Sequence, residues 1–149
     1  MSDYVIRRAA PDDVALITQT WVRGAQRQHD APGLTSALER LLAARLVAGD
    51  VHVAANGDVI LGYVIAQRIG PTVCVVWQWT KERYRRWGVA TRLWRHATDG
   101  ATSVVAAHAP SSWHRTWLRS HGIPLREALP WLALLAEDEV FNGSAQAAE

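Results

Sequence analysis

The sequence has a single cysteine, Cys74, and no apolar run near the roughly 20 residues that a membrane-spanning helix needs. One cysteine excludes an internal disulfide, and its position in an apolar stretch is typical of a small core residue. The segment MSDYVIRRAAPDD lacks the apolar core of a signal peptide, so we expect a cytoplasmic protein with no membrane contact. The net charge is only +2, which disfavours a long nucleic-acid track.

The 149 residues, 49% apolar and 20% charged, are typical of a globular chain. We expect one domain over 1–149, with a loose tail at 141–149. The basic residues are unevenly placed: the stretch 81–95 has six of them and one acid, Glu82. Such a cluster suggests a discrete anionic ligand, and a solvated helix face is the alternative. The eight tryptophans are expected to fill the core and to line a cleft.

Apolar spacing predicts a strand at 4–9 and helices at 11–26 and 35–49, the second capped by Thr35 or Ser36 and ended by Gly49. The later elements alternate between the two periods. They are a hairpin at 51–67 around Asn56-Gly57, a strand at 72–80, a helix at 89–98, a strand at 104–109 and a helix at 111–122 capped by Ser111 or Ser112. Two strands at 123–128 and 131–136 end the pattern, with a short helix as the alternative. The order β-αα-βββ-α-β-α-ββ predicts an α/β (mixed α+β) fold with helices on both faces of a mixed sheet.

The stretch YRRWGVATRLW places a turn between the strand at 72–80 and the helix that follows it. A helix N-terminus has unpaired N–H groups that attract phosphate, and Gly88 has no Cβ to obstruct a close approach. Arg85 and Arg86 add positive charge. These features predict a pyrophosphate cradle, although a purely structural turn would look similar. Neither a Walker P-loop nor a G-x-G-x-x-G dinucleotide fingerprint is present.

Motif and element order together resemble the GCN5-related N-acetyltransferases. Arg85-Arg86-Trp87-Gly88-Val89-Ala90 fits that family's Q/R-x-x-G-x-G/A loop, and the resemblance covers about residues 4–122. It implies a mostly antiparallel mixed sheet of six to seven strands with about four helices. TQTWVRGAQRQ and WQWTKERYRRWGVA look more like phage-encoded members than like the well-studied enzymes.

The resemblance implies acetyl-CoA as co-substrate and no metal. Its pyrophosphate would lie on the loop amides, and its pantetheine arm would pair with the main chain of Trp79 and Thr80 like an added strand. Ser111 stands where the family often has an asparagine that touches the pantetheine, and a plain helix cap is the alternative. The loop residues implied are Arg85, Arg86, Trp87, Gly88, Val89, Ala90 and Thr91.

The usual catalytic side chains are missing from the matching positions. The family's strand glutamate falls on Cys74 and its helix tyrosine on Leu118. Positioning alone could drive the reaction, or His108, at the end of the strand at 104–109, could act as base or through water. The chain could also bind acyl-CoA without transferring the acyl group. His108, His114 and His121 do not have metal-site spacing.

The acceptor cannot be read from the sequence. By the resemblance it would lie between the first two helices and the strand at 72–80, with Trp21, Arg23, Trp77 and Gln78 as candidate wall residues. We expect acetyl transfer to a primary amine of a small molecule, a protein or a nucleobase, by a monomer or a homodimer. The alternatives are a non-catalytic acyl-CoA-binding protein and a basic nucleic-acid-binding module.

Overall fold

A computed structural model describes residues 3–28, 32–106 and 112–127 of the chain. This part has six strands: β1 (Val5–Arg8), β2 (Val51–Asn56), β3 (Val59–Ile69), β4 (Thr72–Thr80), β5 (Ser103–Ala106) and β6 (Leu125–Glu127). Its α-helices are α1 (Val14–Gln28), α2 (Leu34–Ala48), α3 (Val89–Ala97) and α4 (Ser112–Ser120). Short 3₁₀ turns at Pro11–Asp13 and Glu82–Tyr84 come before α1 and α3.

The strands lie side by side in the order in which they occur in the chain, from β1 to β6. The first four pair antiparallel, whereas β5 runs parallel to β4, and β6 parallel to β5. This confirms the predicted fold class and the predicted element order as far as the strand at 123–128. The prediction for 131–136 and the tail at 141–149 fall outside the described residues.

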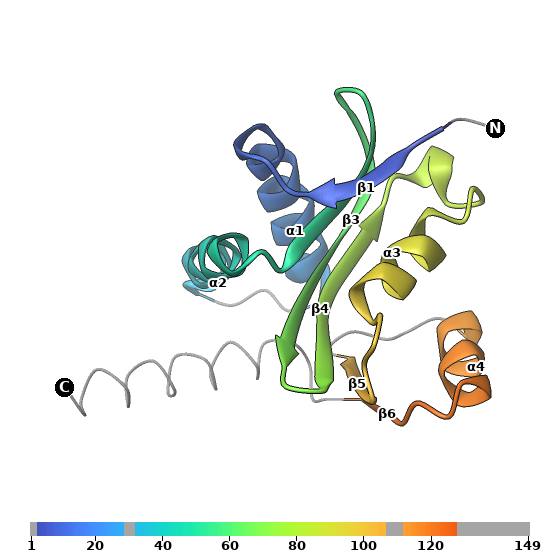
Figure 1. The fold of residues 1–149 in the computed structure, drawn as a ribbon. Coiled ribbons are helices and arrows are strands. Elements are labelled where there is room, and N and C mark those ends of the chain that lie inside the picture. The colour runs from blue at the N-terminus through green and yellow to red at the C-terminus, as the bar shows by residue number, and fades with distance from the viewer. Residues whose placement is uncertain (1–2, 29–31, 107–111, 128–149) are drawn as a thin grey trace.

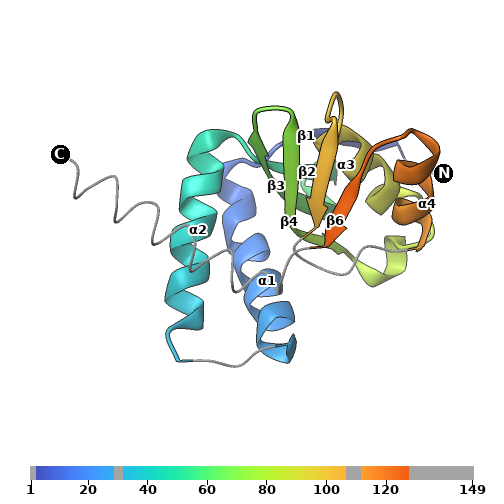
Figure 2. The same ribbon diagram turned by 90° about the horizontal axis from the view of Figure 1, so that it is seen from below.

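Helices cover both faces of the sheet, as Figures 1 and 2 show. Helices α1 and α2 lie on one face, where Trp21, Leu38 and Tyr63 belong to one apolar cluster. Helices α3 and α4 lie on the other face, where Trp94 and Leu118 belong to a second cluster. The sheet therefore separates two cores. No helix in the described ranges is long and apolar enough to cross a membrane.

Two glycines mark the ends of α2. The N-cap is Gly33, at φ 77°, and not Thr35 or Ser36 as the sequence predicted. A glycine adopts this left-handed conformation without a Cβ penalty, so the helix begins one residue after it and both hydroxyl residues fall inside the first turn. Gly49 ends α2 as predicted, with φ 76° and its N–H directed to the last carbonyls.

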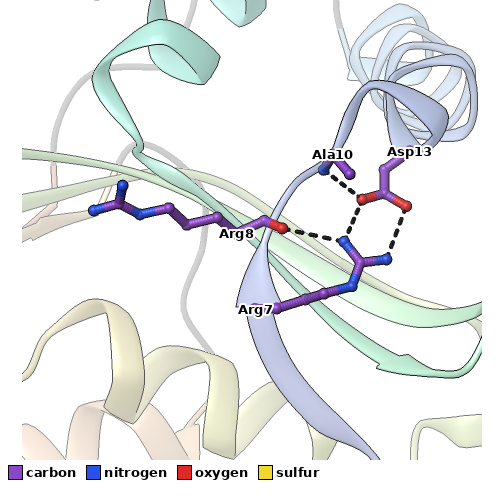
Figure 3. Close-up of polar contacts among 4 residues, drawn as sticks. All are labelled: Arg7, Arg8, Ala10 and Asp13. Carbon is purple, nitrogen blue, oxygen red and sulfur yellow. Dashed lines mark hydrogen bonds and ion pairs between the residues drawn. The ribbon is translucent and has the colours of Figure 1, made fainter.

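The junction between β1 and α1 is fixed by one buried carboxylate (Figure 3). Asp13 accepts hydrogen bonds from the Arg7 guanidinium at 2.6 and 3.2 Å and from the Ala10 N–H at 2.7 Å. Arg7 also donates to the carbonyl of Arg8 at 3.1 Å. The hydrogen bond from Arg7 lowers the pKa of Asp13, so the carboxylate stays charged and ties the start of α1 to β1.

Candidate functional site

Strand β4 continues past the last of its pairings with β5 in the described residues. The parallel register runs from Thr72, opposite Ser103, to Val75, opposite Ala106. Within the described part of the chain, the segment from Val76 to Thr80 has β3 on one side and no strand on the other. In the described part of the chain this edge of β4 has no partner strand, and an extended ligand can pair with such an edge.

A β-bulge lies at Val76, directly after the last described pairing of β4 with β5. On β3, Ile65 pairs with Trp77 and Ala66 pairs with Val75, so Val76 is an extra residue on β4. A bulge of this kind reverses the alternation of side chains along the strand. Both Val76 and Trp77 belong to the core on the α1–α2 face, and we infer that Gln78 and Thr80 face the α3 side.

The register also determines which backbone groups of β4 point to the open edge. The N–H of Lys81 bonds to the carbonyl of Leu61 at 2.8 Å, so every second residue before it, Trp79 included, also turns its N–H and C=O toward β3. The groups at Gln78 and Thr80 therefore face the open edge. The sequence predicted that the main chain of Trp79 and Thr80 would pair with an extended ligand. By this register the backbone groups of Thr80 are available for such pairing, those of Trp79 are not, and Gln78 takes its place.

The turn after β4 ends in an open helix N-terminus. Two hydrogen bonds build the turn, from the Tyr84 N–H to the Lys81 carbonyl at 2.8 Å and from the Trp87 N–H to the Tyr84 carbonyl at 3.1 Å. Gly88 caps α3 at φ 73°, and beyond its two chain neighbours no heavy atom of the described residues lies within 4 Å of the point where its Cβ would be. Among the described residues, the N–H groups from Gly88 to Thr91 have no backbone acceptor, as expected for a helix start.

Electrostatics at this turn favour an anion. The first turn of α3 has no acidic residue, and the helix dipole places partial positive charge there. The side chains of Arg85 and Arg86 are exposed beside it. Four adjacent amides, a glycine with open space above it and two guanidinium groups match the needs of a phosphate or diphosphate.

A second hollow adjoins the turn. Trp87 is 43% exposed and packs edge-on against Tyr84, with ring centroids 4.7 Å apart. The two rings line a pocket of about 230 Å³. Its other lining residues come from the β2–β3 hairpin and are Asn56, Val59 and Leu61. The sequence did not predict this pocket, although the hairpin at Asn56-Gly57 fixes Val59 and Leu61 beside the end of β4.

The predicted acceptor wall is only partly assembled. Trp21 and Trp77 belong to the same cluster and are only 1% and 8% exposed, so both are core residues. Gln78 points to the opposite face of the sheet. Gly24 of α1 lies directly against the Trp77 ring, because a Cβ there would come within 2.9 Å of Cη2.

Tyr63 anchors α1 to the sheet beneath this wall. Its hydroxyl is 2.8 Å from the Thr20 hydroxyl and donates to the Ile17 carbonyl at 3.3 Å. Its ring stacks on Trp79 with centroids 5.7 Å apart. Burial raises the pKa of Tyr63, so its hydroxyl stays protonated and serves a structural role.

The positions of the missing catalytic side chains are both buried. Cys74 is 8% exposed, and Leu118 is 0% exposed in the core under α4. His108 and Ser111 fall outside the described residues. His114 is buried and stacks on Trp94 at 4.3 Å. No group of three metal-ligating side chains occurs in the described ranges.

No protein-family model matches the sequence, and no curated protein matches it significantly. Solved structures do match. One is a Salmonella typhimurium protein assigned as an acetyltransferase and solved with acetyl-CoA. The two sequences are 21% identical, the match covers 80% of this chain and 77% of that chain, and the TM-score is 0.56. Another is a predicted acetyltransferase of Clostridium acetobutylicum with acetyl-CoA, at 16% identity, 81% and 90% coverage and TM-score 0.55.

A Bacillus halodurans protein described as a transcriptional regulator also matches, at 17% identity, 80% of this chain, 89% of that chain and TM-score 0.54. Likeness at these identities establishes a fold and leaves the activity open. The chain shares the fold of these proteins, and this is the fold that its resemblance to the GCN5-related N-acetyltransferases predicted.

Proposed function

We propose that this chain is an N-acetyltransferase that moves the acetyl group of acetyl-CoA to a primary amine. One observation carries the proposal: the open edge of β4 leads directly into the anion-binding turn at the start of α3. An extended arm that ends in a diphosphate fits this continuous run of backbone. The acetyl-CoA present in two proteins of the same fold supports the choice of ligand.

The chain's own backbone would do most of the binding. Gln78 and Thr80 would pair with the amides of the pantetheine arm, as a neighbouring strand does. The N–H groups from Gly88 to Thr91 would bind the diphosphate, with Arg85 and Arg86 contributing charge. Ser111 is a further candidate contact to the arm. Bound acetyl-CoA supplies an acyl group activated as a thioester.

Acetyl transfer then has three requirements that the protein must meet. The amine must be uncharged, because its nitrogen lone pair forms the new C–N bond as the C–S bond breaks. The carbonyl oxygen needs a hydrogen-bond donor, for which a backbone N–H near Thr80 is the candidate. The proton lost by the amine needs an acceptor, and we assign that role to His108, directly or through water. Alignment of the two reactants supplies the remaining acceleration.

The acceptor is an amine of a small molecule, a protein or a nucleobase, and the region between α1, α2 and β4 is its candidate binding site. A cytoplasmic location, a phage origin and a homodimer remain predictions from the sequence alone.

Thermal unfolding with and without acetyl-CoA tests the ligand. A ligand at 100 times its Kd stabilises by about 2.7 kcal/mol, or about 5–10 °C for a domain of this size. Gly88→Asp and Gly88→Asn form a matched pair, since both side chains tolerate the φ of 73° and differ only in charge. We expect Asp to abolish the shift and Asn to weaken it. An equal thermal shift in both variants would show that the turn at Gly88 does not bind the diphosphate.

The second candidate is a non-catalytic acyl-CoA-binding protein. The buried leucine at position 118 favours it, because this apolar side chain has no proton to give to a leaving thiolate. Mass spectrometry of a panel of amines incubated with acetyl-CoA and the protein separates the two functions. Acetylated amine supports the enzyme, whereas a thermal shift without any product supports the binding protein.

A further inference from the structure

Two arginines on α1 have no partner in the described part of the chain. Arg23 and Arg27 are exposed there, and neither has a hydrogen bond, an ion pair or a ring contact. Helix α1 contains no acidic residue. Attraction to the helix C-terminus can account for Arg27, in the last turn, but not for Arg23, one turn earlier. Like charges four residues apart destabilise a helix, so helix stability does not explain the pair.

The two arginines share one face of α1 with residues that contact the sheet. This face has the helical spacing i, i+3, i+4 and i+7 and consists of Thr20, Arg23, Gly24 and Arg27. The Thr20 hydroxyl lies 2.8 Å from the hydroxyl of Tyr63 on β3. Gly24 lies against the Trp77 ring of β4. This face of α1 therefore borders the sheet at the first residues of the open edge of β4.

The arm of acetyl-CoA would end beside this face of α1. With its diphosphate at the turn after Thr80, the arm would run back along the open edge of β4, and its acyl end would point toward Trp77. Helix α1 contacts β4, whereas α2 contacts β3, so α1 is the helix beside this edge (Figure 2). Arg23 and Arg27 flank the glycine that covers the Trp77 ring. They therefore stand near the place where the acceptor amine must meet the acetyl group.

Other charges of the described part of this region have partners or cancel. Strand β4 has no charged residue. On α2, Arg45 bonds to Asp50 at 3.1 Å, and the other two charged residues of that helix, at positions 39 and 40, are neighbours of opposite sign. Asp30 lies outside the described residues. The two arginines of α1 therefore provide a local excess of positive charge.

We propose that Arg23 and Arg27 bind an anionic group of the acceptor, which is a small amine that also carries a carboxylate or a phosphate. The inference rests on the proposed function and names its acceptor class. Guanidinium forks bind both oxyanions through paired hydrogen bonds. Because both arginines flank Gly24, the anionic group would lie within a few bonds of the reacting amine, which favours a small molecule over a protein.

The same positive charge would also assist the chemistry. A nearby cation lowers the pKa of an ammonium group, which favours the uncharged amine that the transfer requires. A polyamine fits this site poorly, because its second ammonium group would be repelled by the two guanidinium groups.

The test compares amines that differ only in the anionic group. The pairs are alanine with ethylamine, 4-aminobutyrate with propylamine, and 2-aminoethyl phosphate with ethanolamine, so that the carboxylate and phosphate sources are separate arms. Spermidine and an acidic peptide with one lysine complete the panel. Initial rates of thiol release from acetyl-CoA give kcat/KM per uncharged amine. We expect at least one anionic amine to exceed its neutral partner by about tenfold or more, the effect of one charge-assisted hydrogen bond.

Substitutions then assign the preference to α1. Arg23→Gln/Arg27→Gln should raise KM for the preferred anionic amine by about tenfold or more, with little change in kcat and an unchanged acetyl-CoA thermal shift. Arg23→Lys/Arg27→Lys should recover part of the preference, because lysine keeps the charge without the planar fork.

Single variants provide the matched control. Arg23→Gln alone should still raise KM for the anionic amine, and it remains testable if the double variant fails to fold. Arg119→Gln also removes one exposed guanidinium group, but from α4 on the other face of the sheet. This control should keep the wild-type KM.

Three results would overturn the inference and leave the acetyltransferase function standing. They are equal kcat/KM for the anionic and neutral partners, faster reaction of spermidine or the peptide, and an unchanged KM in the double glutamine variant. Absence of product from every amine, with the acetyl-CoA thermal shift intact, would overturn both this inference and the proposed enzyme function.

Discussion

A His52→Phe variant should keep most of the stability that the wild-type protein loses as the pH falls from about 7 to about 5. His52 lies on β2, half-buried under α3, and its ring meets that of His96 edge-on at 4.5 Å. Burial, then the positive charges of His96 and Arg8, lower the pKa of His52 from 6.5 to about 4. Phenylalanine keeps the ring contact and cannot take up a proton.

The sign and size follow from proton linkage. Because the unfolded chain protonates this imidazole near pH 6.5 and the folded chain near pH 4, acid favours the unfolded state between these values. Full stability is present above pH 6.5 and is lost as the pH falls toward 4. The difference between the two pKa values of His52 corresponds to at most about 3.4 kcal/mol of unfolding free energy. About 2 kcal/mol of this is lost between pH 7 and pH 5.

Urea unfolding at half-unit steps from pH 7.5 to 4.5 measures this loss directly. His96→Gln is the informative companion variant: it should reduce the loss without abolishing it, since burial is the larger cause of the lowered pKa. The reasoning fails if the wild-type free energy of unfolding is flat over this range, or if His52→Phe follows the wild-type curve.

Three further predictions concern the fold and the chemistry. Gly24→Ala should destabilise the protein by about 1–3 kcal/mol, because the new methyl group overlaps the Trp77 ring and this outweighs the better helix propensity of alanine. The control Gln26→Ala, on the same helix, should change the midpoint of thermal unfolding little. Equal effects of the two substitutions would disprove the overlap. Asp13→Asn should lower the free energy of unfolding by about 1–2 kcal/mol at neutral pH, measured by urea unfolding. Since Arg7 lowers the pKa of Asp13, the difference in unfolding free energy between variant and wild type should shrink only below about pH 4. A difference that stays constant at lower pH would contradict the ion pair. His108→Ala should lower turnover more than it weakens acetyl-CoA binding, as seen by comparing initial rates with the thermal shift, and unchanged turnover would exclude His108 as the proton acceptor.

Local patterns were sufficient for most of the fold. The Asn56-Gly57 turn, the β-branched run of β4 and the helix after Gly88 each have a strong short-range signal, and each element was predicted within a few residues. The start of α2 was misplaced because Thr35 and Ser36 are good caps by composition, while a left-handed glycine two residues earlier takes that role.

The candidate site depends on details that composition hides. In VVWQW every residue suits a strand, so nothing in the sequence reveals that Val76 is a bulge and that the faces exchange after it. That exchange separates Gln78 from Trp77 and shifts the open backbone from Trp79 to Gln78. The burial of Trp21 is a tertiary property that helical spacing alone does not determine. The turn before α3 was predictable because a glycine and a helix start are contiguous, and its role as a diphosphate cradle stays a prediction.

The sheet order has a consequence for how the protein is made. Each strand lies beside the one that precedes it in the chain, so none has to be inserted between two strands already in place. The sheet can therefore grow at one edge as the chain leaves the ribosome. The β2–β3 and β3–β4 pairings are local hairpins, whereas β1 has to wait until α1 and α2 have been made before it can pair with β2. Strands β1 to β4 and the first core could assemble before α3 is synthesised. The turn at the start of α3 would then form on a scaffold that is already in place.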